Sequence, residues 1–90
     1  MSKTLKLVLD VLKPHQPNAL EFSTALANLK ADYRINLIVT EIDKKTESTI
    51  VTIEGEDIHF DDIKNAIEKM GASVHSIDEV EVCGTQSTDV

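Results

Sequence analysis

Carboxylates are the side chains whose number and spacing in this 90-residue chain are most suited to chemistry. Three of them fall within four residues, at Glu54, Glu56 and Asp57, and two more are adjacent at Asp78 and Glu79. Clustered oxygen ligands suit hard cations such as Ca²⁺ or Mg²⁺. One hypothesis is therefore a divalent-cation site; the other is a solvated acidic rim. The candidate ligands are Asp10, His15, Glu54, Glu56, Asp57, His75, Asp78 and Glu79.

The histidines raise a second hypothesis, which is acid–base catalysis. Asp10, His15 and His75 would form the catalytic group if the end of the first strand met the last strand. No two histidines show metal-ligand spacing within one predicted element. Cys83, the single cysteine, has no histidine at a spacing typical of an activated nucleophile. Glycine-rich phosphate loops, HExxH, EF-hand loops and CxxC are absent from the sequence. We therefore predict a non-enzymatic protein with no certain cofactor.

The charge distribution limits the partners. The net charge is −7, and residues 41–90 carry thirteen acidic side chains against four basic ones. An acidic surface repels phosphate backbones, so we expect no nucleic-acid partner. We also expect no membrane partner, because no stretch approaches the ~20 apolar residues of a spanning helix. The single cysteine and the lack of a signal-peptide pattern predict a cytoplasmic protein.

Hydrophobic periodicity predicts the elements that position these residues. Residues 4–12, 34–43, 47–54 and 73–82 read as strands, the middle two forming a hairpin. A first helix begins after Asn18, which forms a capping box with Glu21. Its apolar stripe comprises Ala19, Phe22, Leu26, Leu29 and Tyr33. A second helix begins after His59 and ends before Gly71, and its buried stripe comprises Phe60, Ile63, Ile67 and Met70.

The order βαββαβ predicts an α+β fold, a two-layer ferredoxin-like sandwich. Right-handed crossovers place both helices on one face of a four-stranded antiparallel sheet, with the first and third strands central. The last strand carries three acids, which suits an edge position. We expect a single domain over residues 1–83 and a flexible C-terminal tail over residues 84–90.

The sheet face away from the helices is expected to be uncovered and unusually apolar. It would carry Val8, Leu12, Ile38 and Ile42, and contiguous apolar patches usually mark contact sites. We therefore predict a homo-oligomeric module whose acidic surface binds divalent cations or a partner. The alternative, by fold analogy, is a small-molecule-sensing regulatory domain that binds its ligand at subunit interfaces, near the loop over residues 13–17.

Four segments resemble the small, mainly archaeal family called domain of unknown function 211. They are LDVLKPHQP (9–17), EID with the following TE (41–47), VTIEGEDI (51–58) and HSIDEV (75–80). The resemblance spans about residues 4–82 and implies a ferredoxin-like fold, homo-oligomers and no established activity. At His59 the family carries an acid, so this chain lacks one candidate cation ligand there. The family's recurrent polar positions correspond to Asp10, Lys13, His15, Glu41, Asp43, Glu54, Asp57, His75, Asp78 and Glu79.

Overall fold

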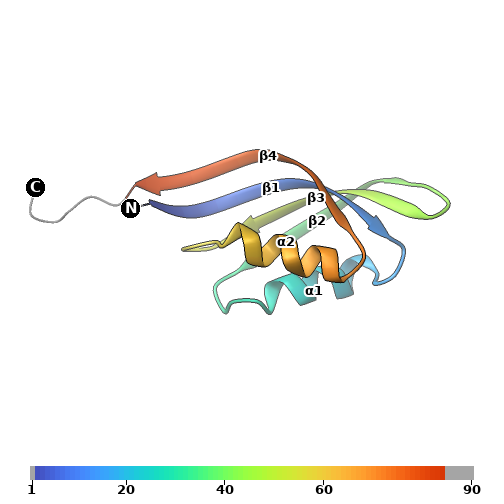
Figure 1. Cartoon of the computed structure of the whole chain (residues 1–90), viewed down its shortest axis with the longest axis horizontal. Coiled ribbons are helices and arrows are strands. Elements are labelled where there is room, and N and C mark those ends of the chain that lie inside the picture. Colours follow the sequence, from blue (N-terminus) through green and yellow to red (C-terminus); the bar gives the residue numbers. More distant parts are fainter. Residues whose placement is uncertain (1, 85–90) are drawn as a thin grey trace, which may run out of the picture.

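The computed structural model describes residues 2–84, and these form two layers (Figure 1). The elements follow the predicted order βαββαβ, and both helices cover the same face of the sheet. The sheet is antiparallel throughout, with the order β2-β3-β1-β4, so β1 and β3 are central as expected. This is the predicted ferredoxin-like α+β fold. The elements are β1 (Ser2–Pro14), α1 (Ala19–Ala27), β2 (Arg34–Ile42), β3 (Thr46–Glu54), α2 (Phe60–Lys69) and β4 (Ser73–Gly84).

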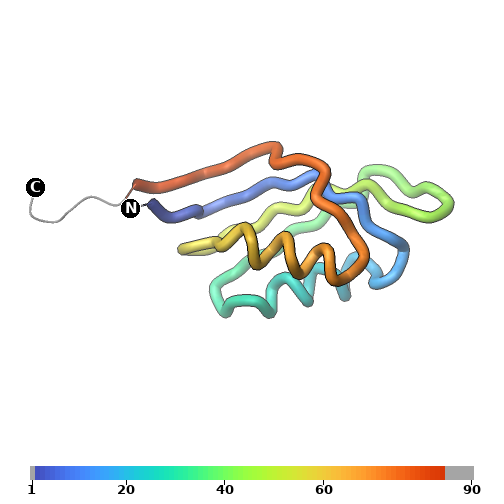
Figure 2. Tube along the Cα trace, viewed as in Figure 1, coloured from blue at the N-terminus to red at the C-terminus, as the bar shows by residue number. Residues whose placement is uncertain are grey.

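The first and last strands are longer than the periodicity predicted. β1 and β4 continue past the helix layer and pair from Ser2 opposite Gly84 (Figure 2). Gly84, expected to begin the tail, therefore ends β4. The rest of the predicted tail, residues 85–90, lies outside the described residues.

The predicted helix caps are largely confirmed. The Glu21 N–H donates to Asn18 Oδ1 at 2.8 Å, and the Asn18 N–H donates to Glu21 Oε1 at 3.0 Å, which completes the capping box. His59 is the N-cap residue of α2 but makes no side-chain capping bond. Gly71 follows α2 with a φ of +85°, a conformation that favours glycine after a helix.

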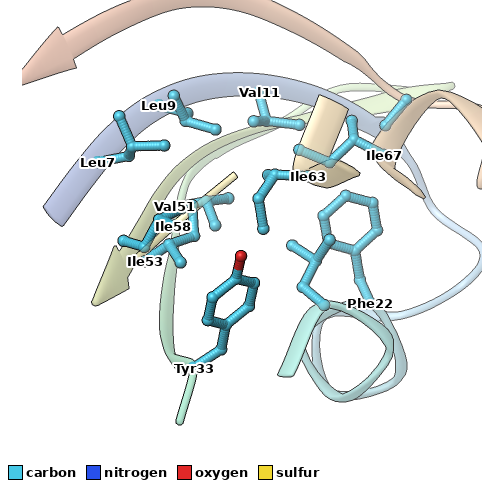
Figure 3. Close-up of a cluster of buried hydrophobic side chains, with 12 residues drawn as sticks. Leu7, Leu9, Val11, Phe22, Tyr33, Val51, Ile53, Ile58, Ile63 and Ile67 are labelled. Atoms are coloured by element: carbon cyan, nitrogen blue, oxygen red, sulfur yellow. The ribbon is translucent and has the colours of Figure 1, made fainter. Parts of the chain in front are cut away.

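The hydrophobic core lies between the helices and the facing side of the sheet (Figure 3). Alternate residues of the central strands point toward the helices, as period-two strands require. Phe22 and Leu26 of α1 and Ile63 and Ile67 of α2 are fully buried against them. The core strand residues are Leu7, Leu9, Val11, Val51 and Ile53.

The end of the α1 stripe differs from the prediction, because α1 stops at Ala27. Leu29 is therefore exposed, while Tyr33 is buried from the segment that follows the helix. The Tyr33 hydroxyl accepts a hydrogen bond from the His59 N–H at 3.0 Å. This bond ties the α1–β2 segment to the start of α2.

The face of the sheet away from the helices is only partly as predicted. Ile38 and Leu12 are exposed there, at 57% and 40%, and Val8 is half-buried. Ile50, which the sequence analysis overlooked, lies between Ile38 and Asp10 in the strand pairing. The prediction for Ile42 was wrong, because a register shift between Val39 and Glu41 moves it to the opposite face.

No helix among residues 2–84 is long and apolar enough to cross a membrane. The longer of the two, α2, has ten residues.

Candidate functional site

The alternation of β1 directs a lysine into the protein interior. Lys13 continues the series Leu7, Leu9, Val11 and therefore faces the helices, where it is 0% exposed. Its ammonium Nζ donates to Glu47 Oε1 at 3.0 Å and to the Pro14 carbonyl at 2.8 Å. It also lies 5.9 Å from the centre of the Phe22 ring, within the range of a cation–π contact.

His15, in the loop between Pro14 and Pro17, contacts the same Glu47 carboxylate. Its Nδ1 lies 2.9 Å from Glu47 Oε2, and its Nε2 lies 2.9 Å from the Lys44 carbonyl oxygen. An ionised carboxylate and a carbonyl can only accept hydrogen bonds, so both contacts are hydrogen bonds only when the ring is a doubly protonated imidazolium. We call these three side chains the Lys13–Glu47–His15 network. It fastens the end of β1 to the hairpin between β2 and β3.

The network shifts two pKa values in opposite directions. The hydrogen bond to Glu47, followed by the bond to the Lys44 carbonyl, raises the pKa of His15 above its ordinary value of 6.5. The hydrogen bonds from His15 and then Lys13 lower the pKa of Glu47 below its ordinary value of 4.5. Both shifts favour the charged forms that bind each other.

These shifts predict a pH dependence of the free energy of unfolding. Because folding raises the pKa of His15, its bonds as a charged ring stabilise the fold fully below pH 6.5. This contribution disappears as the pH rises through the pKa of His15 in the folded state. Because folding lowers the pKa of Glu47, its bonds as a carboxylate stabilise the fold fully above pH 4.5. This contribution disappears as the pH falls through the pKa of Glu47 in the folded state. The network is therefore strongest between pH 4.5 and 6.5.

The test compares wild type with His15→Asn by urea unfolding across pH. We expect the difference in free energy of unfolding to be largest near pH 6 and to shrink steadily above the pKa of the folded histidine. His75→Asn, at an exposed histidine of β4, serves as the matched control and should show no such trend. A difference that is constant across this range would mean that His15 is not the charged partner of Glu47.

The network also bears on two earlier predictions. With both ring nitrogens donating, His15 has no lone pair for a metal ion or for proton abstraction in this state. The expected ligand loop over residues 13–17 is held in place by the same bonds. Binding of a cation or a ligand by His15 in this loop would therefore have to break these hydrogen bonds.

The candidate acids Asp10, Glu54 and Glu79 lie on the face of the sheet away from the helices. Glu79 Oε2 pairs with Lys6 Nζ at 3.2 Å, and Asp78 accepts a bond from the Ser76 hydroxyl at 2.6 Å. Asp10 is paired with Ser76 across the strands, and Glu54 stands opposite Lys6 and Arg34. Two of these acids are thus beside basic side chains.

The remaining candidates lie elsewhere. The Glu56 N–H donates to Asp32 Oδ2 at 2.8 Å, a bond that lowers the pKa of Asp32. Asp57 Oδ2 lies 3.7 Å from His59 Nε2, and His75 is exposed on β4 at a register shift. Residues 2–84 contain no group of three or more His, Cys, Asp and Glu side chains arranged to hold a metal ion.

The sequence did not lead us to predict Glu47 or Lys13 as site residues, although both belong to the Lys13–Glu47–His15 network. Glu47 was seen only as part of a motif, and Lys13 only as a polar position shared with the resembled family. The usable signal was the alternation of β1, which assigns Lys13 to the same face as three core residues. A lysine at such a position requires a buried counter-charge, but its identity comes from strand pairing, which places Lys13 opposite Glu47.

Comparison with known proteins gives two matches. The model of the DUF211 family, described as "Uncharacterized ArCR", matches residues 5–89. The "Uncharacterized protein MJ0319" of Methanocaldococcus jannaschii is 45% identical over 80 residues, which cover 89% of this chain and 82% of that protein. Neither description names an activity, and the family match extends across all the secondary-structure elements described above except the first residues of β1. The chain therefore belongs to the domain of unknown function 211 family, as its four motifs predicted.

Proposed function

We propose that this protein is a non-enzymatic module that assembles with copies of itself through the β4 edge and the adjoining open face of the sheet. The observation that carries the proposal is the character of β4. It is twelve residues long and, within the described chain, pairs only with β1, so one side of its backbone has no partner strand. Long strand edges of this kind pair readily with another chain.

The side chains along this edge support association. Ile77, Val80 and Val82 of β4 are all exposed, the most exposed being Val80 at 56%. The ends of β1 and β4 also extend together beyond the helix layer, so a partner can reach them without meeting the helices (Figure 1). Exposed apolar residues on a free edge indicate a contact surface. Ile77 and Val80 are paired with Leu9 and Leu7 and therefore lie on the helix-facing side of the sheet, whereas Leu12 and Ile38 add exposed apolar side chains on its open face.

The acidic side chains of β4 make this assembly depend on salt. β4 carries Asp78, Glu79 and Glu81, and the chain as a whole has a net charge of −7. Identical acidic edges repel each other, and this repulsion is screened by salt. Acids of two copies brought together would also form the oxygen-rich setting that Ca²⁺ or Mg²⁺ prefers. We therefore expect association to strengthen with ionic strength, and further with divalent cations at matched ionic strength.

Sedimentation velocity at micromolar concentration tests the assembly. Wild type should sediment as an oligomer, and Val80→Lys should shift the distribution toward monomer because it places a charge in the apolar contact. Leu20→Lys is the matched control, since Leu20 is 76% exposed on α1, on the other side of the molecule. A monomeric wild type in high salt and in Mg²⁺ would refute the proposal. Unchanged sedimentation of Val80→Lys would show that the contact does not use the β4 edge.

A further inference from the structure

A small groove opens on the helix side of the molecule, between α2 and the segment that follows α1. Its volume is about 330 Å³, near the lower end of the roughly 300–1,000 Å³ typical of small-molecule sites. Leu29, Tyr33 and Ala66 supply its apolar lining. This groove belongs neither to the Lys13–Glu47–His15 network nor to the β4 edge.

The polar side chains of the groove come mainly from one face of α2. Asp62, Asn65 and Lys69 stand three and four residues apart, a spacing that places them in line along one side of a helix. Lys30 joins them from the segment after α1. The groove therefore offers two ammonium groups, one carboxylate and one amide.

The charges of the groove are available to a ligand. Among the ion pairs between residues 2 and 84, none involves Asp62, Lys69 or Lys30. Lys30 Nζ lies 5.8 Å from the centre of the Tyr33 ring and makes one long hydrogen bond, 3.2 Å to the Asp57 carbonyl, so it keeps donors for a ligand. Two lysines at one groove are also a local positive feature in a chain of net charge −7.

The rim of the groove is braced before any ligand arrives. Tyr33 is buried, and its hydroxyl is bonded to the His59 N–H. Lys30 and Asp32 of the same segment bond the Asp57 carbonyl and the Glu56 N–H, respectively. A Cβ on Gly55 would lie 3.0 Å from Tyr33 Cδ1, so glycine lets the two segments approach this closely. Such preorganisation lowers the entropy cost of binding.

We propose that this groove binds an aliphatic α-amino acid, with its carboxylate held by Lys30 and Lys69, its ammonium by Asp62, and its side chain on the apolar lining. Charges of both signs around an apolar floor match a zwitterion with an aliphatic side chain. The Asn65 amide can donate to the carboxylate or accept from the ammonium. Because the groove is open to solvent, the expected affinity is weak, in the millimolar range.

The first experiment uses the full chain labelled with ¹⁵N and three matched probes. These are L-leucine, 4-methylpentanoate, which lacks the ammonium, and 3-methylbutylamine, which lacks the carboxylate. L-leucine should produce saturable amide shifts confined to residues 29–33 and 62–69, and each analogue should bind at least about tenfold more weakly, as loss of a charge-assisted bond predicts. No saturable shift with L-leucine at tens of millimolar, or equal binding of an analogue, would overturn the proposal.

Substitutions at surface positions then test which side chain binds the carboxylate of L-leucine and which binds its ammonium. Each substitution has a control on the same helix. Lys69→Gln should weaken L-leucine binding at least about tenfold, whereas Lys64→Gln, outside the groove, should change it less than about twofold. Asp62→Asn should abolish the preference for L-leucine over 4-methylpentanoate, and Asp61→Asn should retain it. Equal effects of Lys64→Gln and Lys69→Gln would indicate general charge attraction and refute a specific site.

Val80→Lys separates this inference from the proposed assembly. Val80 lies on β4 and does not line the groove, so a monomeric Val80→Lys protein should bind L-leucine as wild type does. Loss of binding in that variant would contradict a site formed within one chain.

Discussion

Glu47→Ala is expected to destabilise the protein severely. The substitution leaves the fully buried Lys13 ammonium without its counter-charge, next to the Phe22 ring. Removing one partner of a buried ion pair typically costs about 3–5 kcal/mol. A small domain has roughly 5–15 kcal/mol of stability in total, so the loss is a large part of it. Urea unfolding followed by circular dichroism measures the change.

Two further variants test whether the loss of stability comes from the unpaired Lys13 ammonium. Glu41→Ala is the matched control, since Glu41 is exposed in the same hairpin and has no ion pair among the described residues. It should change the free energy of unfolding by less than about 0.5 kcal/mol. Lys13→Met combined with Glu47→Leu should regain most of the loss, because both charges are removed together. Similar costs for Glu47→Ala and Glu41→Ala would refute the buried pair.

Ile67→Ala is expected to have an effect of the same order through a different mechanism. Ile67 is fully buried in the second half of α2 and belongs to the core between the helices and the sheet (Figure 3). Truncating it removes apolar surface from the core and leaves a cavity, which together cost roughly 2–5 kcal/mol. The same method measures the loss, and Leu26→Ala at the equivalent depth in α1 should behave alike.

Leu20→Ala controls for the general cost of shortening a helical leucine. Leu20 is exposed on α1, so the change should remain within about 0.5 kcal/mol. Alanine is also the better helix former, which works against any loss. If Ile67→Ala and Leu26→Ala both cost less than about 0.5 kcal/mol, the two buried stripes are misplaced.

The architecture was largely readable from local patterns. Alternation with period two and apolar stripes with helical spacing gave all six elements in order, because each pattern is complete within one segment. The Asn18–Glu21 capping box and Gly71 fixed two helix ends, since a cap involves residues only a few positions apart. Less well predicted was the end of α1, because the apolar residues Leu29 and Tyr33 continued the spacing beyond the helix itself.

The surface and the candidate sites depended on contacts between distant segments. A register shift in β2 turned Ile42 to the other face, and nothing in the alternation of residues 34–43 announces it. Glu47 meets Lys13 from 34 positions away because β1 and β3 pair in one particular register. The groove likewise combines Lys30 with four side chains of α2. Periodicity shows which way a side chain points within its own segment, but its neighbours depend on pairing and packing, which emerge only when all the segments fold together.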